Sequence, residues 1–280
     1  MRNFLFIAFL LLSQFIDNQQ LIAQNDTLPI QTFKDGILQV DLKGIAISEA
    51  EMIDLLMPVM PGVGSNSRNL LEEKSIKPYM MPPREKGKNG HLYAYTLAAI
   101  LEYYANFKNN FKDNLSPDYI SLSTPVKELE EGLKFLAVNG TVSAAIMPYD
   151  ATTISPAIYA TMKYKIRQYL KVFAINNNSN RRIFETRKAL MRGNPVLVKI
   201  KVDDAFLQNK GTKYWHKVMK NPPHEVTMIV VGYNHDLESF ELMGNWGADW
   251  ADNGYLFMDY EDYGAHARDG FVIVPDRDFK

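Results

Sequence analysis

The strongest constraint on the fold is a change of sequence pattern near residue 194. Before it, helical character marks three segments, at residues 91–107, 127–138 and roughly 182–192. After it, short apolar runs separated by turns indicate strands, at residues 196–202, 226–233, 240–243, 255–260 and 271–274. Helices followed by strands are typical of α+β proteins with segregated helical and sheet parts. The sequence therefore predicts an α+β fold with two halves.

Composition and charge narrow the possible chemistry. The chain has 280 residues, enough for one large domain, and a net charge of −1 that does not favour nucleic acid as a partner. It has no cysteine, which excludes disulfides, thiolate metal sites and thiol catalysis. We expect no cofactor and no resident metal, and the sequence leaves the oligomeric state open.

The first 23 residues have the pattern of a secretory signal peptide. Arg2 precedes the apolar run Phe4–Leu12, and polar residues then lead to a cleavage site near Ala23. Such a run is shorter than the roughly 20 apolar residues that a membrane-spanning helix needs. We expect a secreted or periplasmic protein without a membrane span; the alternative is an N-terminal helix packed on the domain.

Residues 24–77 differ in pattern from the chain that follows. They contain a strand-like stretch at 37–42, a helix capped by Ser48, a Pro- and Gly-rich loop and a charged linker at 72–77. We therefore expect a prosegment-like region with a linker over 24–77 and the main domain over 78–280. Within the main domain, the helical half is expected at about 78–165 and the β half at about 166–280.

Short motifs follow one another in the main domain: PPREKGKNGHLYAY at 82–95, LSPDYI at 115–120, MPYD at 147–150, then residues 223–233 and 243–255. In this order they resemble the papain-like cysteine peptidases, over roughly residues 79–275. The resemblance implies a papain-like fold, with a helical left half, an antiparallel β-barrel-like right half and a cleft between them. The cleft could bind a peptide or protein segment, and an empty cleft without a ligand is equally compatible with the residues.

The resemblance assigns the catalytic positions residue by residue. Leu92 falls at the nucleophile, Lys86 at the glutamine of the oxyanion hole, His224 at the histidine and Gly244 at the asparagine that orients it. The separations from Leu92 to His224 and to Gly244 are close to the roughly 130–150 residues expected of this family. Asn245 follows Gly244, but neighbouring side chains on a strand face opposite sides, so it does not replace the asparagine.

These assignments remove the family's reaction. Leu92 has no heteroatom to attack a carbonyl, and a histidine without a nucleophile performs no acyl transfer. The sequence therefore predicts a peptidase homologue that has lost catalysis. Its binding surface is expected to comprise six residues: Lys86, Gly90, His91, Leu92, His224 and Trp246.

Other interpretations stay open at this point. An active hydrolase would need Thr96 or another hydroxyl as nucleophile. His91, His224 and Glu225 could form a metal site; the alternative is one histidine in the cleft and one solvated histidine. Residues of the prosegment-like region could also fill the cleft permanently. Trp246 is expected to pack on His224. The remaining histidines are expected on the surface or in loops: His216, His235 and His266.

Overall fold

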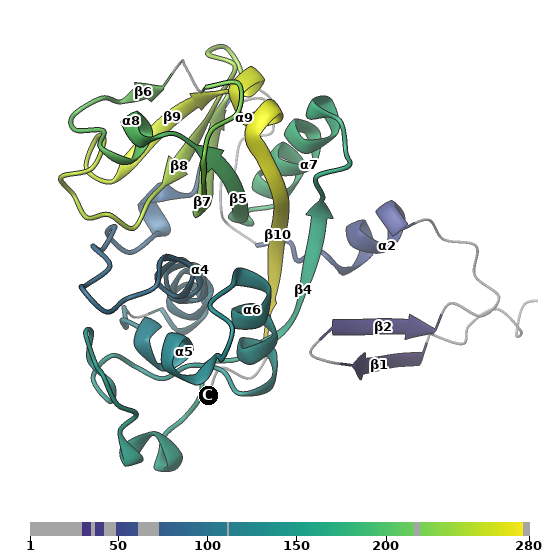
Figure 1. Cartoon of the computed structure of the whole chain (residues 1–280). Coiled ribbons are helices and arrows are strands. Elements are labelled where there is room, and N and C mark those ends of the chain that lie inside the picture. The colour runs from purple at the N-terminus through teal and green to yellow at the C-terminus, as the bar shows by residue number, and fades with distance from the viewer. Residues whose placement is uncertain are drawn as a thin grey trace, which may run out of the picture.

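A computed structural model describes residues 30–34, 37–41, 49–60, 73–110, 112–215 and 219–276. Figure 1 shows two parts, with the helices labelled α4, α5 and α6 grouped below and most of a large sheet above. The fold is therefore α+β with segregated halves, as predicted. No helix within the described ranges is long and apolar enough to cross a membrane. The expected signal peptide and His216 lie outside these ranges.

The helical half contains α4 (Leu92–Asn109), α5 (Pro117–Ser123) and α6 (Leu129–Val138). Ser116 caps α5 by accepting a hydrogen bond from the Tyr119 N–H, with Pro117 at the first helical position, as the sequence indicates. The central helix α4 is almost entirely buried, and its alanines allow neighbouring elements to approach closely. It ends where Asn110 adopts a left-handed conformation, with φ at 53°.

The sheet half is built from eight strands in the order β4-β10-β5-β7-β8-β9-β6, with β3 pairing β7 off this path. Its strands are β3 (Glu73–Ser75), β4 (Ile166–Phe173), β5 (Val196–Val202), β6 (Tyr214–Trp215), β7 (His224–Asn234), β8 (Ser239–Met243), β9 (Tyr255–Asp259) and β10 (Ala267–Pro275). All pairs are antiparallel except β6 with β9. The five predicted strands are confirmed as β5, β7, β8, β9 and β10, and β3, β4 and β6 are additional.

Helices also cover the sheet. Three helices belong to this half, namely α7 (Ser179–Met191), α8 (Asp204–Leu207) and α9 (Tyr260–His266). The 3-10 helices η1 (Lys77–Tyr79) and η2 (Pro156–Ala160) lie in the connecting segments. The prediction of a helix near 182–192 is confirmed as α7, which begins three residues earlier because Asn178 caps it through the Arg181 N–H.

Both faces of β7 are buried, which explains its continuous apolar sequence. Ile229 and Val231 belong to the apolar cluster shared with α4, whereas Met228 and Val230 belong to a second cluster on the other face. This alternation follows from the two-residue period of a strand. The core of the protein therefore lies on both sides of β7, with α4 against one side.

The N-terminal part docks on the sheet half. Strands β1 (Ile30–Lys34) and β2 (Ile37–Asp41) pair with one another, and α2 (Glu49–Leu56) lies beside β4 and α7 (Figure 1). Asp54 accepts an ion pair from Lys188 at 2.6 Å, and Asn194 Nδ2 donates to the Pro58 carbonyl at 2.6 Å. The described residues 49–60 thus pack against α7, β4 and Asn194.

The prediction of a linker at 72–77 is wrong for residues 73–75, which belong to the sheet. Residues 73–75 form β3, which pairs with Gly232, Tyr233 and Asn234 of β7, and Ile76 is fully buried. Lys77 donates to Glu241 at 2.8 Å. A charged composition is typical of linkers, but here the charged residues 73 and 74 lie in a paired strand and Lys77 forms an ion pair with Glu241 of β8.

His266 also differs from its prediction as a surface or loop residue. It lies in the last turn of α9 and is only 7% exposed. Burial lowers the pKa of His266, Arg268 lowers it further, and Asp203 acts in the opposite direction. The folded state therefore favours the neutral imidazole.

This lowered pKa predicts a pH dependence of stability. The unfolded chain takes up a proton on this histidine below about pH 6.5, before the folded protein does. The contribution of His266 is thus present above that pH and is lost as the pH falls toward the folded pKa. We expect denaturant titrations between pH 8 and pH 5 to show a larger loss for the natural chain than for His266→Gln. Equal losses would contradict the prediction.

Candidate functional site

The two halves meet at the N-terminal end of α4. The Lys86 N–H donates to the Asn245 carbonyl at 3.0 Å, and Glu85 forms a bridge with Trp246. The backbone before α4 is thereby joined to the segment that follows β8. We call this region the α4 head; it brings the expected positions Lys86, Leu92 and Gly244 into one neighbourhood.

The approach to α4 is a tight turn. The Gly90 N–H donates to the Gly87 carbonyl at 3.1 Å, and a Cβ on Gly90 would stand 2.6 Å from the Tyr95 ring. Glycine is therefore required by space at this position. His91 is the N-terminal cap residue of α4, without a capping hydrogen bond from its side chain, and Leu92 is the first helical residue.

The hydroxyl of Thr96 is engaged inside the protein. Thr96 is fully buried, and its Oγ1 lies 2.9 Å from the Leu92 carbonyl oxygen and 3.3 Å from that of Thr227. Asn245 Nδ2 donates to the same Oγ1 at 3.1 Å. A buried hydroxyl with these partners has no route to a substrate, so the geometry argues against Thr96 as a nucleophile.

The same contacts place β7 beside the first turn of α4. Leu92 and Trp246 both pack against the apolar cluster that contains Val226. Trp246 makes ring contacts with Phe206 and Trp250, at centroid distances of 6.4 and 4.8 Å. The α4 head is therefore lined by apolar side chains from α4, from β7 and from the segment after β8.

His224 has a different neighbour. Its Nε2 lies 2.7 Å from Asp204 Oδ1 of α8, and both side chains are well exposed. Among the described residues, the ring contacts of Trp246 are with Phe206 and Trp250, so the packing of Trp246 on His224 stays a prediction. Val226 lies two residues further along β7, on the same face as His224. It is next to Thr227, whose carbonyl oxygen accepts the hydrogen bond from Thr96 Oγ1. Sequence reasoning did not single out Val226, because the motif was anchored on a histidine.

Gly244 has no room for a side chain. A Cβ built there would lie 2.5 Å from Cε3 of Trp246 and 2.7 Å from Cζ3, with Trp250 at 3.0 Å. Ring atoms of a packed tryptophan cannot retreat as the end of a flexible side chain can. The space that a side chain at position 244 would need is filled by Trp246.

Two lysines, Lys127 and Lys86, lie near His91 at the rim of the α4 head. Its pKa is lowered by burial, then by Lys127 and Lys86, while Asp118 acts in the opposite direction. His91 lies against the Tyr93 ring, with centroids 6.1 Å apart. Within the described ranges no three His, Asp or Glu side chains are grouped to hold a metal ion, and His91 and His224 have separate partners.

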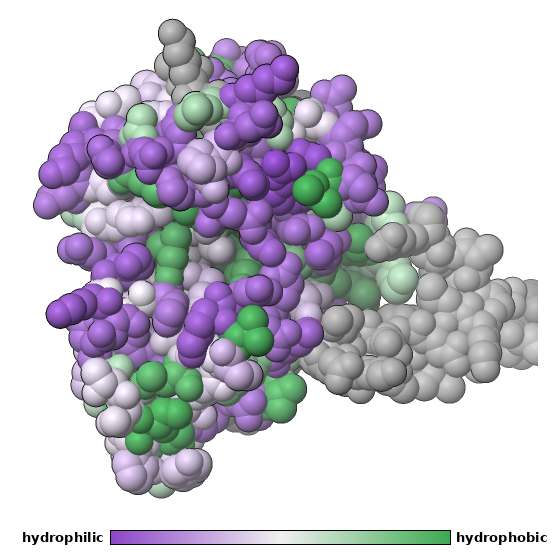
Figure 2. Space-filling view, in the orientation of Figure 1, coloured by the Kyte–Doolittle hydropathy of each residue, from purple (hydrophilic) through white to green (hydrophobic). Residues whose placement is uncertain are grey.

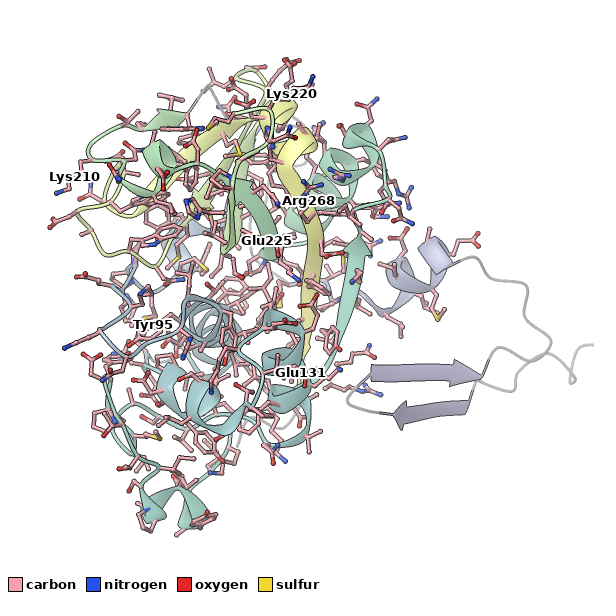
Figure 3. All side chains as sticks on the ribbon, viewed as in Figure 1. Tyr95, Glu131, Lys210, Lys220, Glu225 and Arg268 are labelled. Atoms are coloured by element: carbon pink, nitrogen blue, oxygen red, sulfur yellow. The ribbon has the colours of Figure 1, made fainter. Side chains whose placement is uncertain are left out.

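An ion-pair network crosses between the halves near the α4 head. Lys199 of β5 donates to both carboxylate oxygens of Glu130 of α6, at 3.0 and 3.2 Å, and lies 3.8 Å from Glu225. Figure 3 labels Glu225 where the sheet half faces the helices. These partners raise the pKa of Lys199 although burial lowers it. The network fastens α6 to the start of β7.

One cavity of the described part lies at the other end of α4. Its volume is about 400 Å³, and it is lined by Tyr79, Met81, Phe107 and Lys112, among others. Since α4 has 18 residues at about 1.5 Å rise each, this cavity is far from Leu92. It therefore forms no part of the α4 head.

Comparison with known proteins gives the family. Residues 127–269, just over half of the chain, match the model of the papain family cysteine proteases. The chain belongs to this family. The matched residues begin after α4, so they include Val226 and Gly244 but not Lys86 or Leu92.

Individual relatives are more distant. The chain is 24% identical over 196 residues to the gamete and mating-type specific protein A of Dictyostelium discoideum, covering 64% of this chain and 40% of that protein. It is 25% identical over 191 residues to an uncharacterized peptidase C1-like protein of Acanthamoeba polyphaga mimivirus, covering 62% and 60%. The chain thus spans less than two thirds of either relative.

Solved structures agree on the fold. The structure of the bromelain protease from Ananas comosus, in complex with the E64 inhibitor, has a TM-score of 0.59 and 17% identity, covering 73% of this chain and 99% of that one. At this identity the likeness shows the fold alone. It supports the papain-like arrangement of a helical half and a sheet half.

Proposed function

We propose that this chain is an exported, non-catalytic papain-family protein that holds an extended peptide or protein segment at the α4 head. The observation that carries the proposal is Leu92 at the first position of α4, in a chain of 280 residues without cysteine. A papain-type reaction needs a thiolate at the start of this helix. The division into a prosegment-like region and a main domain remains part of the proposal.

The lining of the α4 head supports a binding role. Leu92 and Trp246 are partly buried and pack on a rigid cluster, and Lys86 and His91 stand at the rim. A mostly apolar surface with a few polar groups is typical of binding sites. The solved structure of bromelain is a complex with the E64 inhibitor, and by analogy of fold we expect this chain also to receive a ligand.

The two alternatives are less well supported. An active hydrolase would use Thr96, whose hydroxyl is buried and hydrogen-bonded. A permanent occupant from the N-terminal part would have to come from outside residues 49–60, because those dock on α7 and β4. We therefore keep a non-catalytic binding protein as the proposed function.

The test uses a single thiol placed by Leu92→Cys. We expect no peptide turnover, because His224 is engaged with Asp204 and a side chain at position 244 is missing. We also expect a pool of random peptides at high micromolar concentration to slow alkylation of this thiol. Mass spectrometry of the peptides detects any cleavage, and mass spectrometry of the protein gives the rate of alkylation with and without peptides.

The matched control is Leu237→Cys, in the turn after β7, where the side chain is 50% exposed. Peptides should leave its alkylation unchanged. Turnover by the natural chain that disappears in His224→Ala would instead indicate an active hydrolase. Equal alkylation of the Leu92→Cys thiol with and without peptides would contradict the binding role.

A further inference from the structure

An uncharged segment projects from the helical half. Residues 151–162, with the sequence ATTISPAIYATM, contain no charged side chain and include η2. We call this segment the apolar tip. Its exposed apolar side chains are Ile154 at 36%, Tyr159 at 83% and Met162 at 41% exposure. Large exposed apolar groups gathered in one place mark interaction surfaces.

The tip is held in a fixed shape. Ser155 caps η2 by accepting a hydrogen bond from the Ala157 N–H, and Ile158 is 2% exposed in a small cluster with Tyr119, Val142 and Met147. With Ile158 turned inward, the neighbouring Tyr159 is turned outward. The exposure of Tyr159 is thus imposed by the packing beneath it, so the backbone that carries Tyr159 is already ordered before binding.

Cations stand at the base of the tip. Lys163 Nζ donates to the Ile158 carbonyl at 2.6 Å, and Lys165 Nζ donates to the Val138 carbonyl at 2.8 Å. Val138 is itself 58% exposed. The tip thus has apolar side chains and an amphipathic tyrosine ring at its end, and lysines at its base. This arrangement suits the interface between lipid and water.

The shape of the tip favours a lipid surface over a protein. Figure 2 shows the lower end of the helical half in pale and green colours, projecting outward and without the deep purple of charged residues. A protein interface surrounds its apolar core with a polar rim that hydrogen-bonds to the partner, whereas residues 151–162 offer no charged side chain to such a rim. A projecting, uncharged end can enter the interfacial layer of a bilayer without matching any particular contour.

We propose that the apolar tip docks this protein reversibly on a lipid surface, with Ile154, Tyr159 and Met162 in the interfacial layer and Lys163 and Lys165 near the head groups. The two lysines give preference to anionic lipids. The inference does not depend on what the α4 head binds. The net charge of −1 means that this attraction is local to the tip.

The absence of cysteine allows a direct test. Met162→Cys in the full chain is labelled with nitrobenzoxadiazole and mixed with vesicles of equal phosphatidylcholine and phosphatidylglycerol. We expect the emission to rise and move to shorter wavelength, because the dye leaves water. We expect phosphatidylcholine vesicles to give a smaller change, and Tyr159→Asp in the labelled chain to lower the bound fraction by about tenfold.

The control is Phe184→Cys, labelled in the same way on α7, where the side chain is 55% exposed. It should stay in water, even if the N-terminal apolar run enters the vesicles. Thermal melting of each variant confirms its fold. An unchanged label at position 162, an equal change at position 184, or a dye response that requires a protein and not vesicles would each overturn the proposal.

Discussion

Replacing Glu102 by alanine is expected to lower the free energy of unfolding by about 3–5 kcal/mol. Glu102 is fully buried in α4; it accepts hydrogen bonds from Arg84 Nη2 and from the Leu115 N–H, the latter at 2.6 Å. Arg84 also donates to the Tyr149 hydroxyl. Without the carboxylate, the guanidinium would remain largely buried and uncompensated. Denaturant titration at neutral pH measures the effect.

This network explains why the loss should be large. Burial raises the pKa of Glu102, and Arg84 and the Leu115 N–H act against it. Arg84 comes just before the turn that leads into α4, so its anchoring also fixes Lys86 at the α4 head. The matched control is Glu131→Ala on α6 (Figure 3), whose pair with Lys134 is exposed and should contribute at most about 1 kcal/mol. Equal losses for the two variants would contradict the argument.

Gly244→Asn is expected to destabilise the protein by about 1–3 kcal/mol, as overpacking does. Its Cβ would overlap the ring of Trp246, which is held against Trp250. Restoring the family's residue at this position therefore costs stability instead of recovering a function. Denaturant titration and thermal melting measure the loss.

The control for this prediction is the same change in a chain with Trp246→Leu. A smaller side chain at 246 opens space, so the added cost of Gly244→Asn should fall by at least about 1 kcal/mol in a double-mutant cycle. Additive effects would mean that the strain lies elsewhere. Peptidase activity is expected in none of these variants, because His224 remains beside Asp204.

Much of the fold could be predicted from the sequence, because the spacing of apolar residues and the turn-forming residues determine helices and strands locally. The start of α5 follows from Ser116 and Pro117, and β7 follows from its long apolar run. Strand β4 was missed although its residues alternate in burial, because the polar Gln168 occupies a buried position where an apolar residue is expected. His266 was misplaced because a polar residue gives no local sign of the neighbours that bury it.

The site was harder to predict, because it depends on contacts between distant segments. The motif order predicts that Leu92, Lys86 and Gly244 lie together, and hydrogen bonds of Asn245 with Lys86 and Thr96 join the segments that carry them. The inward direction of Asn245 could not be derived from strand alternation, because Gly244 and Asn245 follow the end of β8. The pairing of His224 with Asp204 could not be read from the sequence. The same holds for the ring of Trp246 over Gly244, since a side chain's position is set by everything around it.

Strand β3 has a consequence for how the chain can be divided. A protein starting at residue 78 would lose the strand that pairs with Gly232–Asn234, the buried Ile76 and the Lys77–Glu241 ion pair. The exposed edge would offer unpaired N–H and C=O groups to other chains. We therefore expect a chain cut within residues 73–77 to be less stable and more prone to associate than a chain cut before residue 73, so the sheet itself favours an earlier boundary.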